Sequence, residues 1–206
     1  SGMIHPSMAT MLSYLTCDVG VDHALWSDMI KRVAESSFNS ITVDGDTSTN
    51  DTFLAFSSGA ELDPRYLSTL EEGLHITAQY LAKAIARDGE GANCLLEIKV
   101  EGAQSNLDAQ GIARTIASSS LVKTAVHGSD PNWGRIIAAL GRSGVFFNLC
   151  DVKLWIGPYA VFANGIPLDF DRKIVSNFMK ARLKGKYLID DLIRIKLMVG
   201  MGKGSA

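Results

Sequence analysis

Apolar residues recur at helical spacing in several stretches of the chain. The stripe that begins at Trp26 predicts a helix over Val21–Ser36, with Asp22 as its N-cap. The pair Asp63-Pro64 predicts a second helix start, and the apolar spacing that follows continues to Arg87. Further helices are predicted over 107–118, from Asp130-Pro131 into 132–140, and near 171–180.

Alternating apolar and polar residues predict strands between these helices. In 96–100 the apolar side chains alternate with charged ones, which is typical of a strand with one face in water. Asn164-Gly165 predicts a two-residue hairpin turn. The other strands are predicted at 37–43, 53–57, 145–149, 152–156, 159–163 and 188–199.

The order of these elements favours an α+β fold. Strands and helices are mixed, no period repeats, and the late strands follow one another like hairpins. We therefore expect α/β sandwich layers in which mixed, largely antiparallel sheets pack with helices. With 206 residues, 47% of them hydrophobic, and no Pro/Gly-rich linker, the chain fits one compact domain or a large piece of one.

Charge and cysteine content narrow the classes of partner. A net charge of −2, from 20 basic and 22 acidic residues, gives no basic surface for nucleic acid. No stretch has the length and apolarity of a membrane span. Cys17, Cys94 and Cys150 are far apart, which predicts buried free thiols in a reducing compartment and neither a disulfide frame nor a zinc site.

A dense polar cluster occupies 44–52. Asp44-x-Asp46-x-Ser48 matches the first ligand positions of a calcium loop, but Thr49 stands where that loop needs glycine and Ala55 where it needs glutamate. Two interpretations remain open: a turn held by side-chain bonds to the backbone, and a segment that lines a site.

Two other positions could carry chemistry. If the Ala9–Thr10 bond were cut, the hydroxyl of Thr10 would lie beside its own α-amino group, a usable base at neutral pH. The glycines on either side of Glu90 would let that carboxylate approach a ligand, although a solvated acid at a helix end is the simpler interpretation.

The remaining candidates are weaker. The four histidines share no ligand spacing, and no Gly-x-Ser-x-Gly nucleophile motif accompanies them. Trp133 and Arg135 could bind an anion at a helix start, but helix packing explains them as well.

Together these motifs resemble the ornithine acetyltransferases, the bifunctional glutamate N-acetyltransferases of arginine biosynthesis. The resemblance is dense over 1–145 and thinner beyond. It is carried, in the order of that family, by Gly2-Met3-Ile4, 8–12, Ser37-Phe38-Asn39, 41–52, 88–92, 117–123 and 130–135.

The resemblance implies an N-terminal-nucleophile-like arrangement and a precursor that cuts itself at Ala9–Thr10. Thr10 would take the acetyl group from N-acetylornithine as an ester and pass it to glutamate, and acetyl-CoA is a possible second donor. Glu90 would bind the substrate's ammonium group or assist proton transfer. No metal or prosthetic group is implied.

The resemblance also implies that residues 1–9 end an α chain and that 10–206 form a β chain without its last segment. The two chains would assemble as an α2β2 heterotetramer, cytoplasmic, or plastid or mitochondrial in a eukaryote. The family's substrate lysine and its Thr-Gly oxyanion donors precede the first residue here, so we expect the chain alone to cut itself slowly and not to turn over.

Two alternatives remain. A hydrolase with the same kind of nucleophile, as in related aminopeptidases, would pass the acyl group to water, although the long match at 41–52 argues against it. A degenerate subunit would only bind a partner, although the presence of both Thr10 and Glu90 argues against that interpretation.

Overall fold

A computed structural model describes residues 11–46 and 50–206. The chain forms two compact units, unit 1 (1–90) and unit 2 (91–206), which are described separately. The sequence predicted no division. The boundary falls in the turn after Arg87, which is too short to stand out as a linker.

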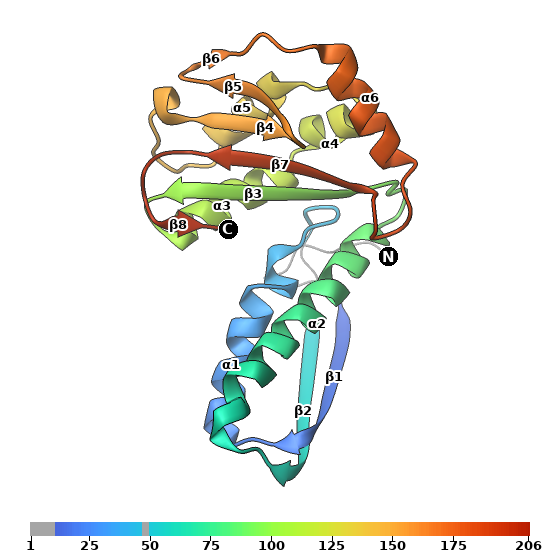
Figure 1. Ribbon diagram of the computed structural model, residues 1–206, viewed down its shortest axis with the longest axis vertical. Coiled ribbons are helices and arrows are strands. Elements are labelled where there is room, and N and C mark those ends of the chain that lie inside the picture. Colours follow the sequence, from blue (N-terminus) through green and yellow to red (C-terminus); the bar gives the residue numbers. More distant parts are fainter. Residues whose placement is uncertain (1–10, 47–49) are drawn as a thin grey trace. The chain divides into compact units, whose positions relative to one another are not determined.

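Unit 1 is a βαβ unit followed by a long helix (Figure 1). Its two strands pair in parallel from Leu12 opposite Thr52, as the helical crossover between them requires. Its elements are β1 (Leu12–Gly20), α1 (His23–Glu35), the 3-10 turn η1 (Phe38–Ser40), β2 (Thr52–Glu61), η2 (Pro64–Tyr66) and α2 (Leu67–Arg87).

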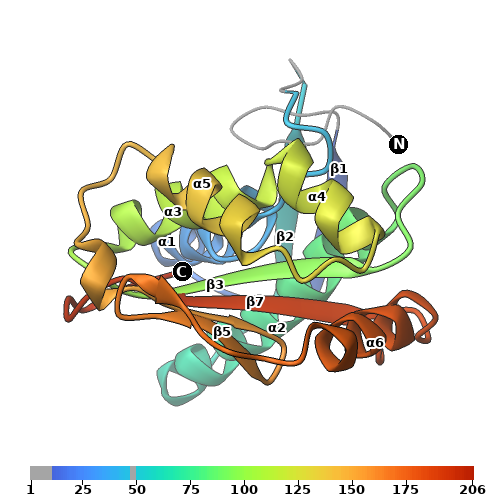
Figure 2. The same ribbon diagram turned by 90° about the horizontal axis from the view of Figure 1, so that it is seen from above.

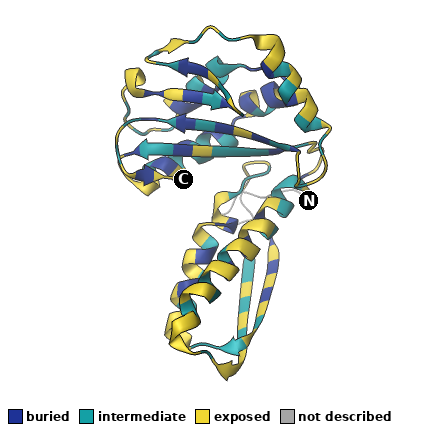
Figure 3. Cartoon of the chain, viewed as in Figure 1, coloured by how far each residue is buried: buried dark blue, intermediate teal, exposed yellow. Residues whose placement is uncertain are grey.

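The core of unit 1 lies between the two strands and the two helices. In β1 the buried Ser13 and Leu15 alternate with exposed residues, as Figure 3 shows, and Leu15 belongs to the same core cluster as Val33 of α1 and Ala78 of α2. The indole N–H of Trp26 donates to the carbonyl of Ala55 at 3.1 Å, which ties α1 to β2. The predicted cap at Asp22 is confirmed, because its side chain accepts backbone N–H bonds. Asp63 is also a cap, but of the 3-10 turn η2, and α2 itself begins at Leu67.

Unit 2 is a six-stranded mixed sheet in the order β6-β5-β4-β7-β3-β8. Three helices, α3 to α5, lie on one face and α6 lies on the other (Figure 2). The elements are β3 (Leu95–Ala103), α3 (Asn106–Ala117), α4 (Ser120–His127), α5 (Trp133–Gly141), η3 (Leu149–Asp151), β4 (Lys153–Ile156), β5 (Tyr159–Ala163), β6 (Ile166–Pro167), α6 (Arg172–Leu183), β7 (Leu192–Met198) and β8 (Gly204–Ser205).

The core of unit 2 surrounds the parallel pair β3–β7. Val100 of β3 and Leu197 of β7 lie opposite each other, and both are fully buried against the helices that include Ile112. The other four strand pairings described in this sheet are antiparallel. The sheet is therefore mixed, and the predicted α+β class is confirmed.

Several local predictions were wrong. Residues 37–43 form η1 and irregular chain, because Phe38 turns into the core against Phe53, 4.7 Å between ring centroids. Residues 145–148 alternate between partly buried and exposed, but no described strand pairs with them, and Leu149 begins the 3-10 turn η3. The helix predicted from Asp130-Pro131 begins at Trp133, with Asn132 as its cap.

The thiols also differ from prediction in part. Cys17, Cys94 and Cys150 are all free, as predicted, and the first two are partly buried. Cys150 is exposed, because it lies in the short turn η3 at the surface. None of the helices in the described ranges is long and apolar enough to cross a membrane.

Gly59 offers a test of the β1–β2 register. The register shifts there, φ is +110°, and an added Cβ would lie 2.0 Å from the carbonyl oxygen of Asp18. We expect Gly59→Ala to lower the free energy of unfolding by about 2 kcal/mol or more. The control Gly73→Ala, in α2 with no atom within 4 Å of the added Cβ, should raise it by up to about 1 kcal/mol. Urea unfolding of both proteins measures the two effects, and equal effects would contradict the assigned register.

Glu101 of β3 gives unit 2 a pH dependence. Its carboxylate pairs with Lys196 at 2.8 Å and Lys99 at 2.9 Å, and these bonds, that to Lys196 foremost, hold the pKa of Glu101 below its ordinary value. A lowered folded-state pKa means that the stabilisation is present above the ordinary pKa and is lost as the pH falls through the folded one.

We therefore expect Glu101→Gln to be less stable than the parent at pH 7, by less than about 1 kcal/mol because the pair is partly exposed. The difference should shrink as the pH falls toward 3. Unfolding midpoints across this range measure it, with Glu72→Gln on α2 as the control. A difference that stays constant with pH would exclude the ion pairs as its cause.

Candidate active site at the start of β1

The predicted cleavage site borders the described structure. Ala9 and Thr10 lie outside the described residues, and the description begins with Met11, which is bonded to Thr10. The N–H of Met11 donates to Oδ1 of Asp51 at 2.6 Å, and its carbonyl accepts the N–H of Thr52 at 2.8 Å. The Met11 side chain is 6% exposed. The residue after the predicted nucleophile is thus held at its nitrogen, its oxygen and its side chain.

Asp51 reaches this position because β1 and β2 are parallel. The two strands begin side by side, so the residue before β2 faces the residue before β1. The second carboxylate oxygen of Asp51, Oδ2, is closed off from solvent and has no hydrogen-bond partner within the part of the chain that the structure describes. Burying such an oxygen unpaired is costly, so native structures seldom leave one without a partner.

The sequence did not single out Asp51. It stood within a cluster of acids, hydroxyls and amides over 44–52, and only the parallel pairing distinguishes it from the others. In the described parts of the cluster, 44–46 and 50–52, side chains bond to the backbone, as one of the two interpretations held. The N–H of Asp46 donates to Oδ1 of Asp44 at 2.9 Å, and Thr52 Oγ1 donates to the carbonyl of Asn50 at 3.3 Å.

The turn that carries Glu90 contacts this connection. An added Cβ on Gly89 would lie 2.8 Å from Cγ1 of Val43, so the turn packs directly on the segment that leads into β2. Glu90 itself is exposed. The end of α2 and the starts of β1 and β2 lie at the same end of unit 1 (Figure 1).

The other candidates have structural roles. Trp133 packs on Phe162, 5.5 Å between ring centroids, and the guanidinium of Arg135 donates to the carbonyl of Leu121 and the hydroxyl of Thr124, each at 3.0 Å. Helix packing therefore accounts for both residues. Nδ1 of His75 lies 2.7 Å from the hydroxyl of Ser36, which joins α2 to the end of α1. Within the described ranges, no group of three or more His, Cys, Asp or Glu side chains could hold a metal ion.

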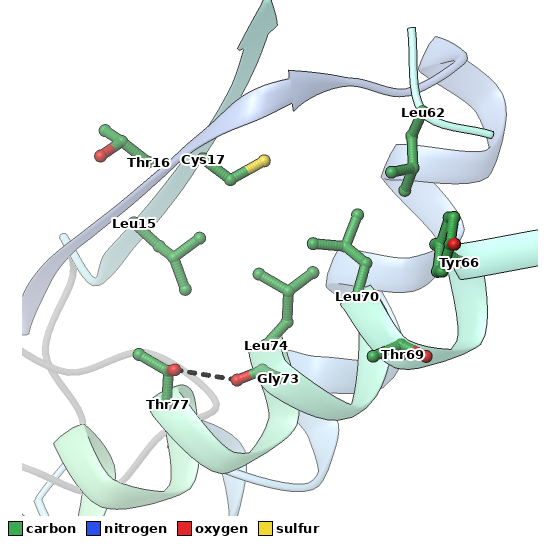
Figure 4. Close-up of a pocket in the computed structure, with 10 residues that line it drawn as sticks. All are labelled: Leu15, Thr16, Cys17, Leu62, Tyr66, Thr69, Leu70, Gly73, Leu74 and Thr77. Carbon is green, nitrogen blue, oxygen red and sulfur yellow. Dashed lines mark hydrogen bonds between the residues drawn. The ribbon is translucent and has the colours of Figure 1, made fainter. Parts of the chain in front are cut away.

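A hollow of about 450 Å³ lies between β1 and α2 (Figure 4). The leucine side chains that line it point toward one another. The hydroxyl of Thr77 donates to the carbonyl of Gly73 at 2.8 Å, so this donor is already used within α2. Charged groups are missing from this lining, so it does not suit a polar amino-acid substrate. It is lined by Leu15, Thr16, Cys17, Leu62, Tyr66, Thr69, Leu70, Gly73, Leu74 and Thr77.

The face of β1–β2 that points away from the helices is apolar and exposed. Parallel strands are almost always covered on both faces, because their crossovers and neighbours pack on each side. No described element of unit 1 covers this one. Its large side chains are Leu12 at 62%, Tyr14 at 60%, Leu54 at 41% and Phe56 at 53% exposure.

Comparisons with known proteins agree on one family. The ArgJ family matches residues 1–206. Two cyanobacterial proteins, each named arginine biosynthesis bifunctional protein ArgJ, are 87% identical over the whole chain (Prochlorococcus marinus NATL2A) and 59% identical over 99% of it (strain MIT 9313). The chain spans 49% and 48% of their lengths, about half.

A solved structure gives the same fold. A chain of the ArgJ crystal structure from Bacillus halodurans superposes with a TM-score of 0.87 at 36% identity. The match covers 96% of this chain and 92% of that one, so the two chains are similar in length.

Proposed function

The chain belongs to the ArgJ family, and from that membership we propose that it forms the acetyl-transferring half of a bifunctional enzyme of arginine biosynthesis. The family match over the full chain is the observation that carries the proposal. The fixed position of Met11, directly after Thr10, supports it, because a nucleophile needs a rigid support.

We propose that a longer precursor cuts itself at Ala9–Thr10. Residues 1–9 then end the α chain, and 10–206 belong to the β chain that Thr10 begins. The lengths support this division: the curated relatives are about twice as long as this chain, whereas the Bacillus halodurans chain is similar to it in length.

In the first half of the reaction, the hydroxyl oxygen of Thr10 attacks the acetyl carbonyl of N-acetylornithine. The α-amino group of Thr10 takes the hydroxyl proton and delivers it to the departing amine. The amide C–N bond breaks, an ester bond to Thr10 forms, and ornithine leaves.

In the second half, the amine of glutamate attacks the ester carbonyl. An amide C–N bond forms, the ester C–O bond to Thr10 breaks, and the proton from the glutamate amine reaches the Thr10 oxygen through the α-amino group, which restores the hydroxyl. Acetyl-CoA would form the same ester with release of its thiol, so it is a possible second donor. Glu90 would bind the substrate's ammonium group or assist proton transfer, and its place at the end of α2, in a turn packed on the connection to β2, is compatible with this role. The scheme needs no metal or prosthetic group. We propose that the reaction takes place in the cytoplasm.

The α chain is the proposed partner of the apolar face of β1–β2. The relatives contain about as much chain again as is present here, enough to supply a covering layer. The four large side chains of that face would then become core residues. An α2β2 heterotetramer follows if two such pairs associate.

Intact mass tests the cleavage. Co-expressed with the remaining half of the Prochlorococcus marinus NATL2A relative, the chain should be cut after residue 9. It should release ornithine from N-acetylornithine over many turnovers only when glutamate is present, and about one ornithine per Thr10 without it. Thr10→Ala should stay uncut and inactive, and the chain expressed alone should keep residues 1–9. Sustained ornithine release without glutamate, beyond one per Thr10, would favour the hydrolase, and no activity in the assembled protein would favour a non-catalytic subunit.

Two substitutions test the partner. Tyr14→Thr and Phe56→Thr keep strand-forming residues but remove large apolar surface, so less of the other half should copurify with the chain. The control is Tyr80→Gln on α2, where the tyrosine is also 60% exposed. An equal loss of the other half in the control, or no loss in the strand variants, would argue against this face as the interface.

A further inference from the structure

We propose that β1 is an inner strand of a larger sheet in the assembled protein, and that its free edge pairs with a strand from the other half of the protein. Side chains on one face of that added strand would fill the hollow between β1 and α2. This inference rests on the proposed function, because the other half is the partner proposed there.

The free edge of β1 follows from the direction of its backbone groups. Met11 directs both its N–H and its carbonyl toward the start of β2. Successive residues of a strand direct these groups to opposite sides, and the pairing with β2 is regular from Leu12 to Cys17. The backbone groups of Leu12, Tyr14 and Thr16 therefore point away from β2, to a side where no described strand pairs with β1.

The outer edge of β2 is different, because a side chain of α1 already bonds to it. The N–H of Thr52 faces β1, so by the same alternation the backbone groups of Ala55 face outward. The Ala55 carbonyl accepts the indole N–H of Trp26 at 3.1 Å. A carbonyl that is already bonded to an indole is a poor partner for another strand, so β1 offers the better edge.

The hollow lies beside the edge of β1. Its lining comes from β1, α2 and the residues just before α2, and includes no residue of β2. A Cβ added to Gly73, in the interior of α2, would meet no atom within 4 Å. Glycine costs a helix interior about 1 kcal/mol relative to alanine, and no described side chain packs on this one. The space over Gly73 therefore suits side chains that come from outside unit 1.

The added strand should be apolar on both faces. Its side chains alternate, so one set enters the hollow beside Leu15 and Leu70, and the other extends the exposed apolar face that includes Leu12 and Tyr14. Strands that are buried on both faces are continuous apolar runs. The partner is therefore an apolar run of about five or six residues in the other half, for which the length of the relatives leaves room.

Amide hydrogen exchange in the co-expressed, assembled protein tests the pairing. In an edge strand the amides that point outward exchange much faster than those bonded to the neighbouring strand, whereas an inner strand protects both sets. We expect the amides of Tyr14 and Thr16 to be protected to within about tenfold of that of Leu15, which points to β2. Exchange of both outward amides about 100-fold faster than that of Leu15, or more, would overturn the proposal.

Thr16→Pro tests the edge by substitution. Proline removes one outward N–H, and strands accept it at an edge where that N–H has no partner in the sheet. The apparent dissociation constant of the assembly, measured by dilution, should rise about tenfold or more, as for a lost hydrogen bond. The control Thr16→Val keeps the N–H and a branched side chain, and it should bind like the parent. Equal dissociation constants for the two variants would contradict the pairing.

Gly73→Leu tests the hollow without changing the edge. Leucine fills the space from α2 itself and is a better helix former than glycine, so the yield of soluble chain should hold while the dissociation constant rises about tenfold or more. The control Glu72→Leu adds the same side chain at the next position of α2, which is exposed and outside the lining. Normal assembly of Gly73→Leu would overturn the proposal even if Thr16→Pro failed to fold.

Further outcomes separate this inference from the proposed function. If the other half does not copurify with the unsubstituted chain, the proposed partner fails, and this inference fails with it. If Tyr14→Thr weakens the assembly but Thr16→Pro and Gly73→Leu do not, the other half covers the apolar face without adding a strand, and this inference alone fails. Two differently tagged copies of the chain that copurify without the other half, and no longer do so as Thr16→Pro, would assign the edge to a second copy and overturn it as well.

Discussion

The parallel pairing of β1 with β2 is the constraint on which the candidate site depends. It places the beginnings of both strands at one end of unit 1, and so brings Asp51 to Met11 across 40 residues of chain. An antiparallel pair would put the residue before β2 at the far end of β1. The helix between the strands makes the parallel arrangement possible and also supplies the layer that buries Met11.

The same pairing leaves one side of the strands without a layer. The even-numbered residues of β1 from 12 to 18 are exposed, whereas Met11, Ser13 and Leu15 are buried. One face of the strand therefore packs in the core of unit 1, and the other is covered by no described element of that unit. Unit 2 differs, because helices lie on both faces of its sheet and its central strands β3 and β7 each contribute buried residues, such as Val100 and Leu197, to one core. Unit 2 is therefore the more complete of the two units within the described chain.

The sequence predicted those parts of the fold in which local pattern and long-range contacts agree. The caps at Asp22 and Asp63, the long helix to Arg87 and the hairpin turn at Asn164-Gly165 depend on neighbours in the sequence, and all are present. Residues 145–149 alternate as a strand does, but a strand also needs a partner, which periodicity cannot supply. The hydrogen bond between Asp51 and Met11 also depends on a partner far away in the sequence. No local signal distinguishes Asp51 from the other acids of its cluster. Thr10 and Glu90 were chosen from motif chemistry and family resemblance, and they remain predictions.

The register shift at Gly59 divides β1 into two parts with different freedom. From Leu12 to Cys17 each residue has one fixed partner on β2, and this continuous ladder leads directly to Met11. Beyond Cys17 an extra residue is already accommodated by the turn of the backbone at Gly59. A residue gained or lost before the shift would exchange the buried and exposed faces of the strand and displace the chain beside Thr10, whereas one beyond the shift would be absorbed locally. The number of residues in Leu12–Cys17 is therefore constrained by the pairing with β2, whereas insertions or deletions beyond Cys17 should be tolerated during evolution.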